Sequence, residues 1–160
     1  MPNVIAIMPG IESINSMLAE VARANVGGDL SCYYSLGTLP PAESIARSLD
    51  AYFSAMKTSN SPPQTPQCWN IRTTELKDPK IQLIAATRRW FYELDFSPKV
   101  DAVTAERSIN EFMKILQTIV GDSRVFEVYV DPPMWYDCDW QDFAFDGGDT
   151  RWFLHFGFSD

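Results

Sequence analysis

Hydrophobic side chains recur every three or four residues in three segments, and this spacing predicts three amphipathic helices. The first runs from about Ile11 toward the glycine pair at 27–28, because glycine readily adopts the left-handed conformation that ends a helix. The second follows the diproline at 40–41, and the third is predicted to begin after Asp101 as its N-cap and to end near Val120. Their apolar stripes are Ile11, Ile14, Leu18 and Val21; Ile45, Leu49, Phe53 and Met56; and Ala105, Ile109, Phe112, Leu116 and Ile119.

The segment 88–96, Arg-Arg-Trp-Phe-Tyr-Glu-Leu-Asp-Phe, alternates between two sets of side chains. Trp90, Tyr92 and Leu94 would lie on one face of an extended chain, and mostly charged residues would lie on the other. This alternation predicts a half-buried strand. The preceding run at 81–84 either extends this strand or begins a helix.

Two strands are predicted near the C-terminal end, at 140–145 and 151–158, around an Asp-Gly-Gly-Asp turn at 146–149. Glycine accepts the positive φ angles that tight hairpin turns require, so this stretch is a strong hairpin signal. The second of these strands carries aromatic residues on both faces, which indicates that it is central or covered on both sides. Further strands are predicted at 3–8, 30–36 and 125–130.

Strands and helices thus alternate along the chain and end in a hairpin, which favours a mixed or antiparallel sheet. The sequence predicts an α+β fold with about three helices and a C-terminal β-hairpin. The 160 residues fit a single domain, 1–160. The stretch at 59–67, rich in proline and serine, is interpreted as a surface loop within that domain.

Composition narrows the class of protein. Hydrophobic residues make up 46% and charged residues 21% of the chain, which is typical of a globular domain. Cys32, Cys68 and Cys138 are scattered and form no metal-binding pair, so they indicate a reducing compartment. The apolar run at the N-terminus is too short for a signal peptide, and no stretch could span a membrane. We therefore expect a cytoplasmic protein that does not bind a membrane.

Negative charge and aromatic side chains are concentrated together in the segment 125–160. This segment holds eight acidic residues and one basic residue, Arg151, so it contributes −7 of the net charge of −8. It also contains 11 of the 21 aromatic residues. Because an acidic surface repels nucleic-acid phosphates and attracts basic proteins, we expect a basic protein partner and no direct binding of nucleic acid.

No catalytic or cofactor motif is present. His155, the only histidine, lies in a predicted strand without a Gly-x-Ser-x-Gly elbow before it, which favours a hydrogen-bonded sheet residue over a catalytic base. Asp137-Cys138-Asp139 begins like a calcium loop but lacks the later glycine and glutamate. In an extended chain, Asp137 and Asp139 would share one face and Asp142 would lie on the other. We therefore predict no catalytic residue, no metal site and no cofactor.

The strongest candidate site is the aromatic and acidic stretch that follows the diproline at 132–133. Large aromatic side chains bury much area for little loss of rotamer entropy, and acidic neighbours would steer a basic partner. The alternative is that these aromatic residues belong to the core. The predicted partner-binding residues are Trp135, Tyr136, Asp137, Asp139, Trp140, Asp142, Asp146 and Asp149.

The stretches Trp-Gln-Asp-Phe-Ala-Phe at 140–145 and Trp-Phe-Leu-His-Phe-Gly-Phe-Ser-Asp at 152–160 resemble the ends of some small bacterial toxin-immunity proteins. This resemblance implies a cytoplasmic protein that binds a toxin domain, such as a nuclease, and occludes its active or substrate-binding surface. Two other interpretations stay open. One is a phage or assembly protein that oligomerises through its terminal strands, and the other is a hydrolase that uses the clustered aspartates with a divalent cation.

Overall fold

The computed structural model describes residues 10–56, 69–133 and 135–160. Within these ranges the chain forms four helices and a five-stranded sheet, which confirms the predicted α+β class with one helix more than expected. The strand predicted at 3–8 and the loop predicted at 59–67 lie outside the described residues. The helices are α1 (Ile11–Ala24), α2 (Ile45–Ser54), α3 (Pro79–Tyr92) and α4 (Ala102–Val120). The strands are β1 (Ser31–Thr38), β2 (Asn70–Glu75), β3 (Arg124–Asp131), β4 (Asp139–Asp146) and β5 (Arg151–Ser159).

All neighbouring strands are antiparallel, in the order β1-β5-β4-β3-β2. The predicted hairpin joins β4 to β5, and its turn contains Gly148 with a φ angle of 86°. β5 lies between β4 and β1, so the last strand of the chain pairs with the first of the described strands. This pairing places Ser35 of β1 opposite His155 of β5.

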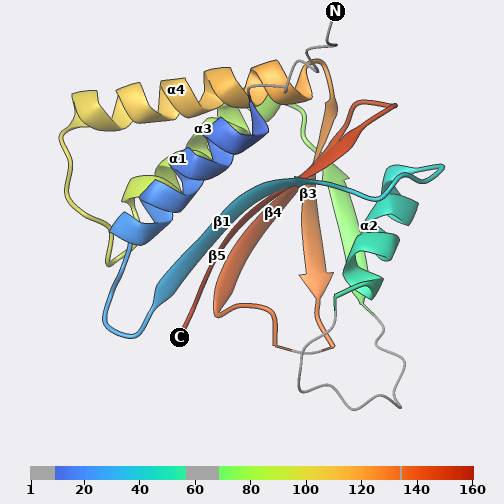
Figure 1. Ribbon diagram of the computed structural model, residues 1–160, viewed down its shortest axis with the longest axis horizontal. Helices are drawn as coiled ribbons and strands as arrows, with labels where there is room; N and C mark the ends of the chain where they lie inside the picture. The colour runs from blue at the N-terminus through green and yellow to red at the C-terminus, as the bar shows by residue number, and fades with distance from the viewer. Residues whose placement is uncertain (1–9, 57–68, 134) are drawn as a thin grey trace, which may run out of the picture.

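Three helices, α1, α3 and α4, cover one face of the sheet, and α2 covers part of the other (Figure 1). The larger core lies under the three helices and includes Trp90, Phe112 and Phe156. The smaller core lies under α2 and includes Phe53 and Phe153. Side chains alternate along a strand, so β5 contributes to both cores, as its two aromatic faces indicated. None of the helices in the described ranges combines the length and apolar character that a membrane crossing requires.

The strand predicted at 88–96 is wrong, because most of this segment belongs to helix α3. The buried residues Leu83, Trp90 and Phe91 follow the spacing of a helix, together with Ala86 and Thr87. Pro79 stands in the first turn, where its missing N–H is not needed. The alternation at 90–94 is too short to distinguish the two periods, whereas the run from 83 to 91 matches only the helix.

Two further differences concern local signals. The sequence did not predict β2, because this edge strand is mostly exposed and lacks apolar alternation. α2 begins at Ile45, several residues after the diproline, where the Ser44 hydroxyl accepts a hydrogen bond from the backbone N–H of Arg47. The predicted cap of α4 is confirmed, since the Asp101 carboxylate accepts a hydrogen bond from the N–H of Thr104 at 2.8 Å.

Candidate functional site

The imidazole ring of His155 is held between two carboxylates on the face of the sheet that carries α2. Its Nδ1 atom lies 2.6 Å from Oδ1 of Asp142, and its Nε2 atom lies 2.8 Å from Oδ2 of Asp137. The hydroxyl of Tyr136 donates to Oδ2 of Asp142 at 2.9 Å and lies 3.1 Å from Nδ1 of His155. We call these four residues the His155 cluster.

The sheet register and one glycine bring the cluster together. Asp142 on β4 and His155 on β5 are cross-strand partners, so their side chains lie beside each other on one face. Asp137 precedes β4 and reaches this face by lying over Gly157. A Cβ atom at position 157 would overlap Oδ2 of Asp137 and lie 2.7 Å from Nε2 of His155. Only glycine therefore leaves room for the contact between Asp137 and His155.

The cluster is buried and charged. The exposed fractions of the side chains are 13% for His155, 7% for Asp137 and 0% for Asp142. Burial opposes the charged imidazolium, but hydrogen bonds and charges from Asp137 and Asp142 outweigh it and raise the pKa of His155 to about 9. Burial raises the pKa of Asp142, and the hydrogen bond from His155 acts against this. The raised pKa of His155 favours the charged form of its ring at neutral pH, in contact with the carboxyl groups of Asp137 and Asp142.

This geometry disfavours His155 as a catalytic base. A general base needs a ring nitrogen that can reach the proton of a substrate. Both nitrogens of His155 contact carboxylates, and the raised pKa keeps the ring protonated at neutral pH. The cluster instead joins the segment before β4 to the sheet, because Tyr136 and Asp137 are hydrogen-bonded to Asp142 and His155.

A pocket of about 320 Å³ opens beside the His155 cluster. It lies where β1 and β5 carry polar side chains on the face shared with α2. Among its described lining residues the only basic group is the His155 ring, which is already paired with the carboxyl groups of Asp137 and Asp142. The lining residues are Tyr33, Ser35, Tyr52, Met56, Tyr136, Asp137, His155 and Ser159.

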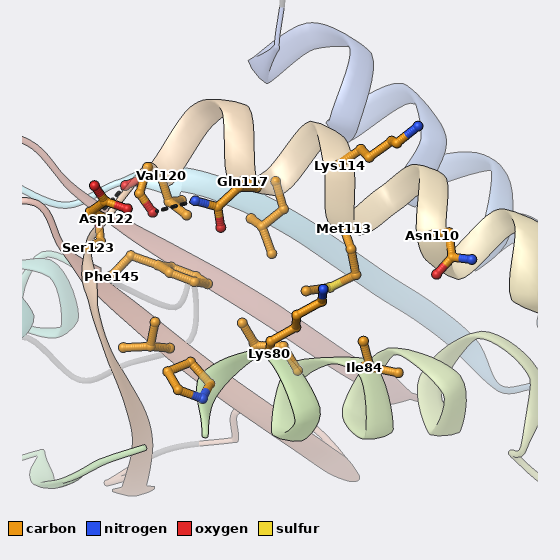
Figure 2. A pocket seen from close by; sticks show the side chains of 15 residues that line it. Lys80, Ile84, Asn110, Met113, Lys114, Gln117, Val120, Asp122, Ser123 and Phe145 are labelled. Atoms are coloured by element: carbon orange, nitrogen blue, oxygen red, sulfur yellow. Dashed lines mark hydrogen bonds between the residues drawn. The ribbon is translucent and has the colours of Figure 1, made fainter. Parts of the chain in front are cut away.

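A larger cavity of about 880 Å³ lies on the opposite face, between α3 and α4. Figure 2 shows Lys80 and Ile84 rising from α3 toward Met113 on α4, with Phe145 at one end. The walls of this cavity are mainly apolar. Among its described lining residues, two are basic, Lys80 and Lys114, and one is acidic, Asp122. This cavity therefore does not match a basic partner, in contrast to the pocket beside the His155 cluster.

The eight predicted partner-binding residues do not gather on one surface. Tyr136, Asp137 and Asp142 form the His155 cluster, and Asp142 has no exposed surface with which to contact a partner. Trp140 is partly buried and packs against the smaller core. Trp135, in contrast, is 64% exposed. The aromatic residues of this stretch are thus divided between the core and the surface.

Asp139 lies on the other face of the sheet from Asp142, where it pairs with Arg89 of α3 at 2.8 Å. The extended chain that would place Asp137 and Asp139 on one face is interrupted by a bend at Cys138, and the two side chains lie on opposite faces. The backbone N–H of Cys138 donates to the carbonyl of Phe158 at 2.8 Å, and the Asp137 side chain turns back over the sheet. Asp137 therefore contacts His155 on the same face as Asp142, although the alternation of an extended strand would place these two aspartates on opposite faces.

Asp146 and Asp149 lie at the opposite end of β4 from Trp135. Asp146 pairs with Arg151 at 2.9 Å, and both side chains are largely buried, whereas Asp149 is exposed in the hairpin turn. Seven residues of extended chain separate the two ends of β4, or about 23 Å. One partner could bind both ends only across the full length of the sheet.

Sequence reasoning did not predict that His155 is the centre of a buried cluster. The hairpin could have indicated one contact, because pairing Asp146 with Arg151 across the turn places Asp142 opposite His155. No local signal indicates the contact of Asp137, which depends on Gly157 lying beneath it.

Comparison with protein-family models, with curated proteins and with solved structures finds no match to this chain. Among the residues that the structure describes, no group of three or more His, Cys, Asp or Glu side chains is arranged to hold a metal ion.

Proposed function

We propose that this chain is a non-enzymatic, cytoplasmic binding protein of the immunity type, which neutralises a toxin domain by covering its active or substrate-binding surface. The observation that carries the proposal is that Trp135 is 64% exposed although it directly precedes the buried His155 cluster. A large aromatic side chain held in solvent beside a rigid support is suited to anchor a partner.

The support for Trp135 comes from its neighbour in the chain. The Tyr136 hydroxyl bonds to Asp142, and its ring contacts Phe53 and Trp140, with centroid distances of 6.0 and 5.1 Å. Such contacts restrict the backbone next to Trp135 before any partner binds. Binding then orders fewer groups, which favours affinity.

The charge around Trp135 favours a basic partner. Asp131 at the end of β3 and Asp160 after β5 are exposed at this end of the sheet, and half-exposed Asp139 begins β4. The whole chain carries a net charge of −8. Complementary charge would speed the encounter with a basic toxin domain and make its rate depend on salt.

The two edge strands of the sheet are protected against pairing with another chain. This favours a binding protein over an assembly protein that oligomerises through its strands. The side chain of Asn15 donates to the carbonyl of Leu36 at 2.8 Å and accepts from the N–H of Leu36 at 2.9 Å. Asn15 thus occupies backbone groups of edge strand β1 that a second strand would need. The other edge strand, β2, is short and carries Arg72 and Glu75, which also oppose pairing with another sheet.

The test asks whether a neighbouring gene encodes a toxin domain, co-expresses that domain with this protein, and titrates the two purified proteins by calorimetry. A neighbourhood without a toxin domain would count against the proposal. We expect growth to be restored, an equimolar complex to form, and association to slow as salt rises. Trp135→Ala should weaken binding about fivefold or more, because truncating an anchor costs more than about 1 kcal/mol. Val103→Ala is the matched control, since Val103 is 67% exposed on α4. Absence of a complex, or equal affinities for the two variants, would reject the proposal.

A further inference from the structure

The pocket beside the His155 cluster has aromatic walls from three separate elements. Tyr33 of β1 is 57% exposed, Tyr52 comes from α2, and Tyr136 belongs to the cluster. The volume of about 320 Å³ lies at the lower end of the range for ligand pockets, which is about 300–1,000 Å³. A single side chain of a partner therefore suits this space better than a large cofactor.

The pocket also offers hydrogen-bond acceptors and negative charge. Asp137 uses Oδ2 for its hydrogen bond to His155, and its Oδ1 atom has no hydrogen-bond donor in the described chain. Within those same ranges, the hydroxyls of Tyr33, Ser35 and Tyr52 likewise have no hydrogen-bond partner. The pocket thus combines three aromatic rings, several free acceptors and a carboxylate.

We infer that this pocket binds the guanidinium group of an arginine side chain presented by the partner. The inference rests on the proposed function, because it assumes that a basic protein docks beside Trp135. A guanidinium is planar, carries five N–H donors and stacks on aromatic rings, so Asp137 Oδ1, the hydroxyls and the tyrosine rings can all contact it. An ammonium is a compact and strongly hydrated charge that matches fewer of these groups.

The direct test is an NMR titration of the ¹⁵N-labelled protein with three blocked peptides that differ only in a central arginine, lysine or citrulline. Citrulline has the shape of arginine without its charge. We expect the arginine peptide to shift the amide signals of Ser35 and His155 saturably, with an affinity about fivefold or more above the other two peptides. Equal affinities for the three peptides, or shifts confined to residues outside the pocket, would overturn the inference.

Two variants with matched exposure locate the binding site. Tyr33→Leu removes a pocket wall at an exposed position, and we expect it to abolish the preference for arginine. Tyr129→Leu is the control, because Tyr129 is 44% exposed on β3 and does not line the pocket. Retention of the arginine preference in Tyr33→Leu would count against the pocket as its site.

The same variants separate this inference from the proposed function. If Trp135→Ala weakens binding of the toxin domain and Tyr33→Leu does not, the pocket plays no part in docking and the inference fails while the proposed function stands. If the arginine peptide binds in the pocket but no toxin domain forms a complex, the pocket assignment stands and the proposed function fails.

Discussion

The Nδ1 atom of His155 lies 2.6 Å from Oδ1 of Asp142, a carboxyl group whose side chain has no exposed surface. This contact joins β4 to β5 at the centre of the sheet face that carries α2. A buried charge is tolerated only when it is paired and hydrogen-bonded, and Asp142 also accepts from Tyr136. The pair therefore couples the stability of the sheet to the position of the segment that carries Trp135.

The stability contributed by His155 should fall as pH rises. Folding raises the pKa of His155 from 6.5 to about 9, so the native state binds the proton more tightly than the unfolded chain does. This contribution is complete below pH 6.5 and lost as pH approaches about 9, and it amounts to roughly 3 kcal/mol. Urea unfolding of the wild type and of His155→Gln at several pH values measures it. A difference between the two proteins that stays constant from pH 6.5 to 9 would contradict a protonated His155.

Asp142→Asn should lower the pKa of His155 toward its ordinary value, because the substitution removes a buried negative charge beside the ring. Loss of one partner from a buried ion pair costs about 3–5 kcal/mol, and the amide oxygen retains part of the hydrogen bonding. An NMR titration of the His155 ring and chemical unfolding measure the two effects. Asp149→Asn is the control in the exposed turn, with an expected change in stability within about 0.5 kcal/mol. If the pKa of His155 is the same in both variants, the ring is not paired with the Asp142 carboxylate.

Gly157→Ala should separate Asp137 from His155 without removing either group. The added methyl group would overlap Oδ2 of Asp137, so the carboxylate must move, at an expected cost of about 1–3 kcal/mol. Gly37→Ala in β1 is the matched control, because no atom lies within 4 Å of the place that its new methyl group would take. Chemical unfolding compares the two, and NMR of the His155 ring reports the lost contact. Similar stability of both variants would show that Asp137 does not depend on the space above Gly157.

Asn15→Ala should expose the edge of β1. The substitution removes both hydrogen bonds to Leu36, at an expected cost of about 1–3 kcal/mol, and leaves its backbone groups open to another strand. Sedimentation velocity over a range of concentrations should reveal self-association of this variant. Asn110→Ala, an exposed asparagine on α4, provides the comparison and should stay like the wild type. If neither variant associates, Asn15 does not protect this edge.

Local patterns predicted several elements well. Asp101 begins α4 as expected, and the Asp-Gly-Gly-Asp turn forms the hairpin between β4 and β5. α3 was misassigned, because the short alternation around Trp90 suits either period, whereas the longer run of buried residues from 83 to 91 matches only a helix. β2 carried no apolar pattern, since an edge strand is held mainly by backbone hydrogen bonds to β3.

The sequence by itself determined the α+β class, the C-terminal hairpin, and the concentration of acidic and aromatic residues near the end of the chain. These follow from periodicity, turn chemistry and composition, which act over a few neighbouring residues. The tertiary structure alone decided which of those residues meet. Tyr33 lies beside His155 because β1 pairs with β5, and Asp137 reaches the ring because the chain bends over Gly157. Such contacts depend on strand order and on free space above one residue, and neither is encoded in a local pattern.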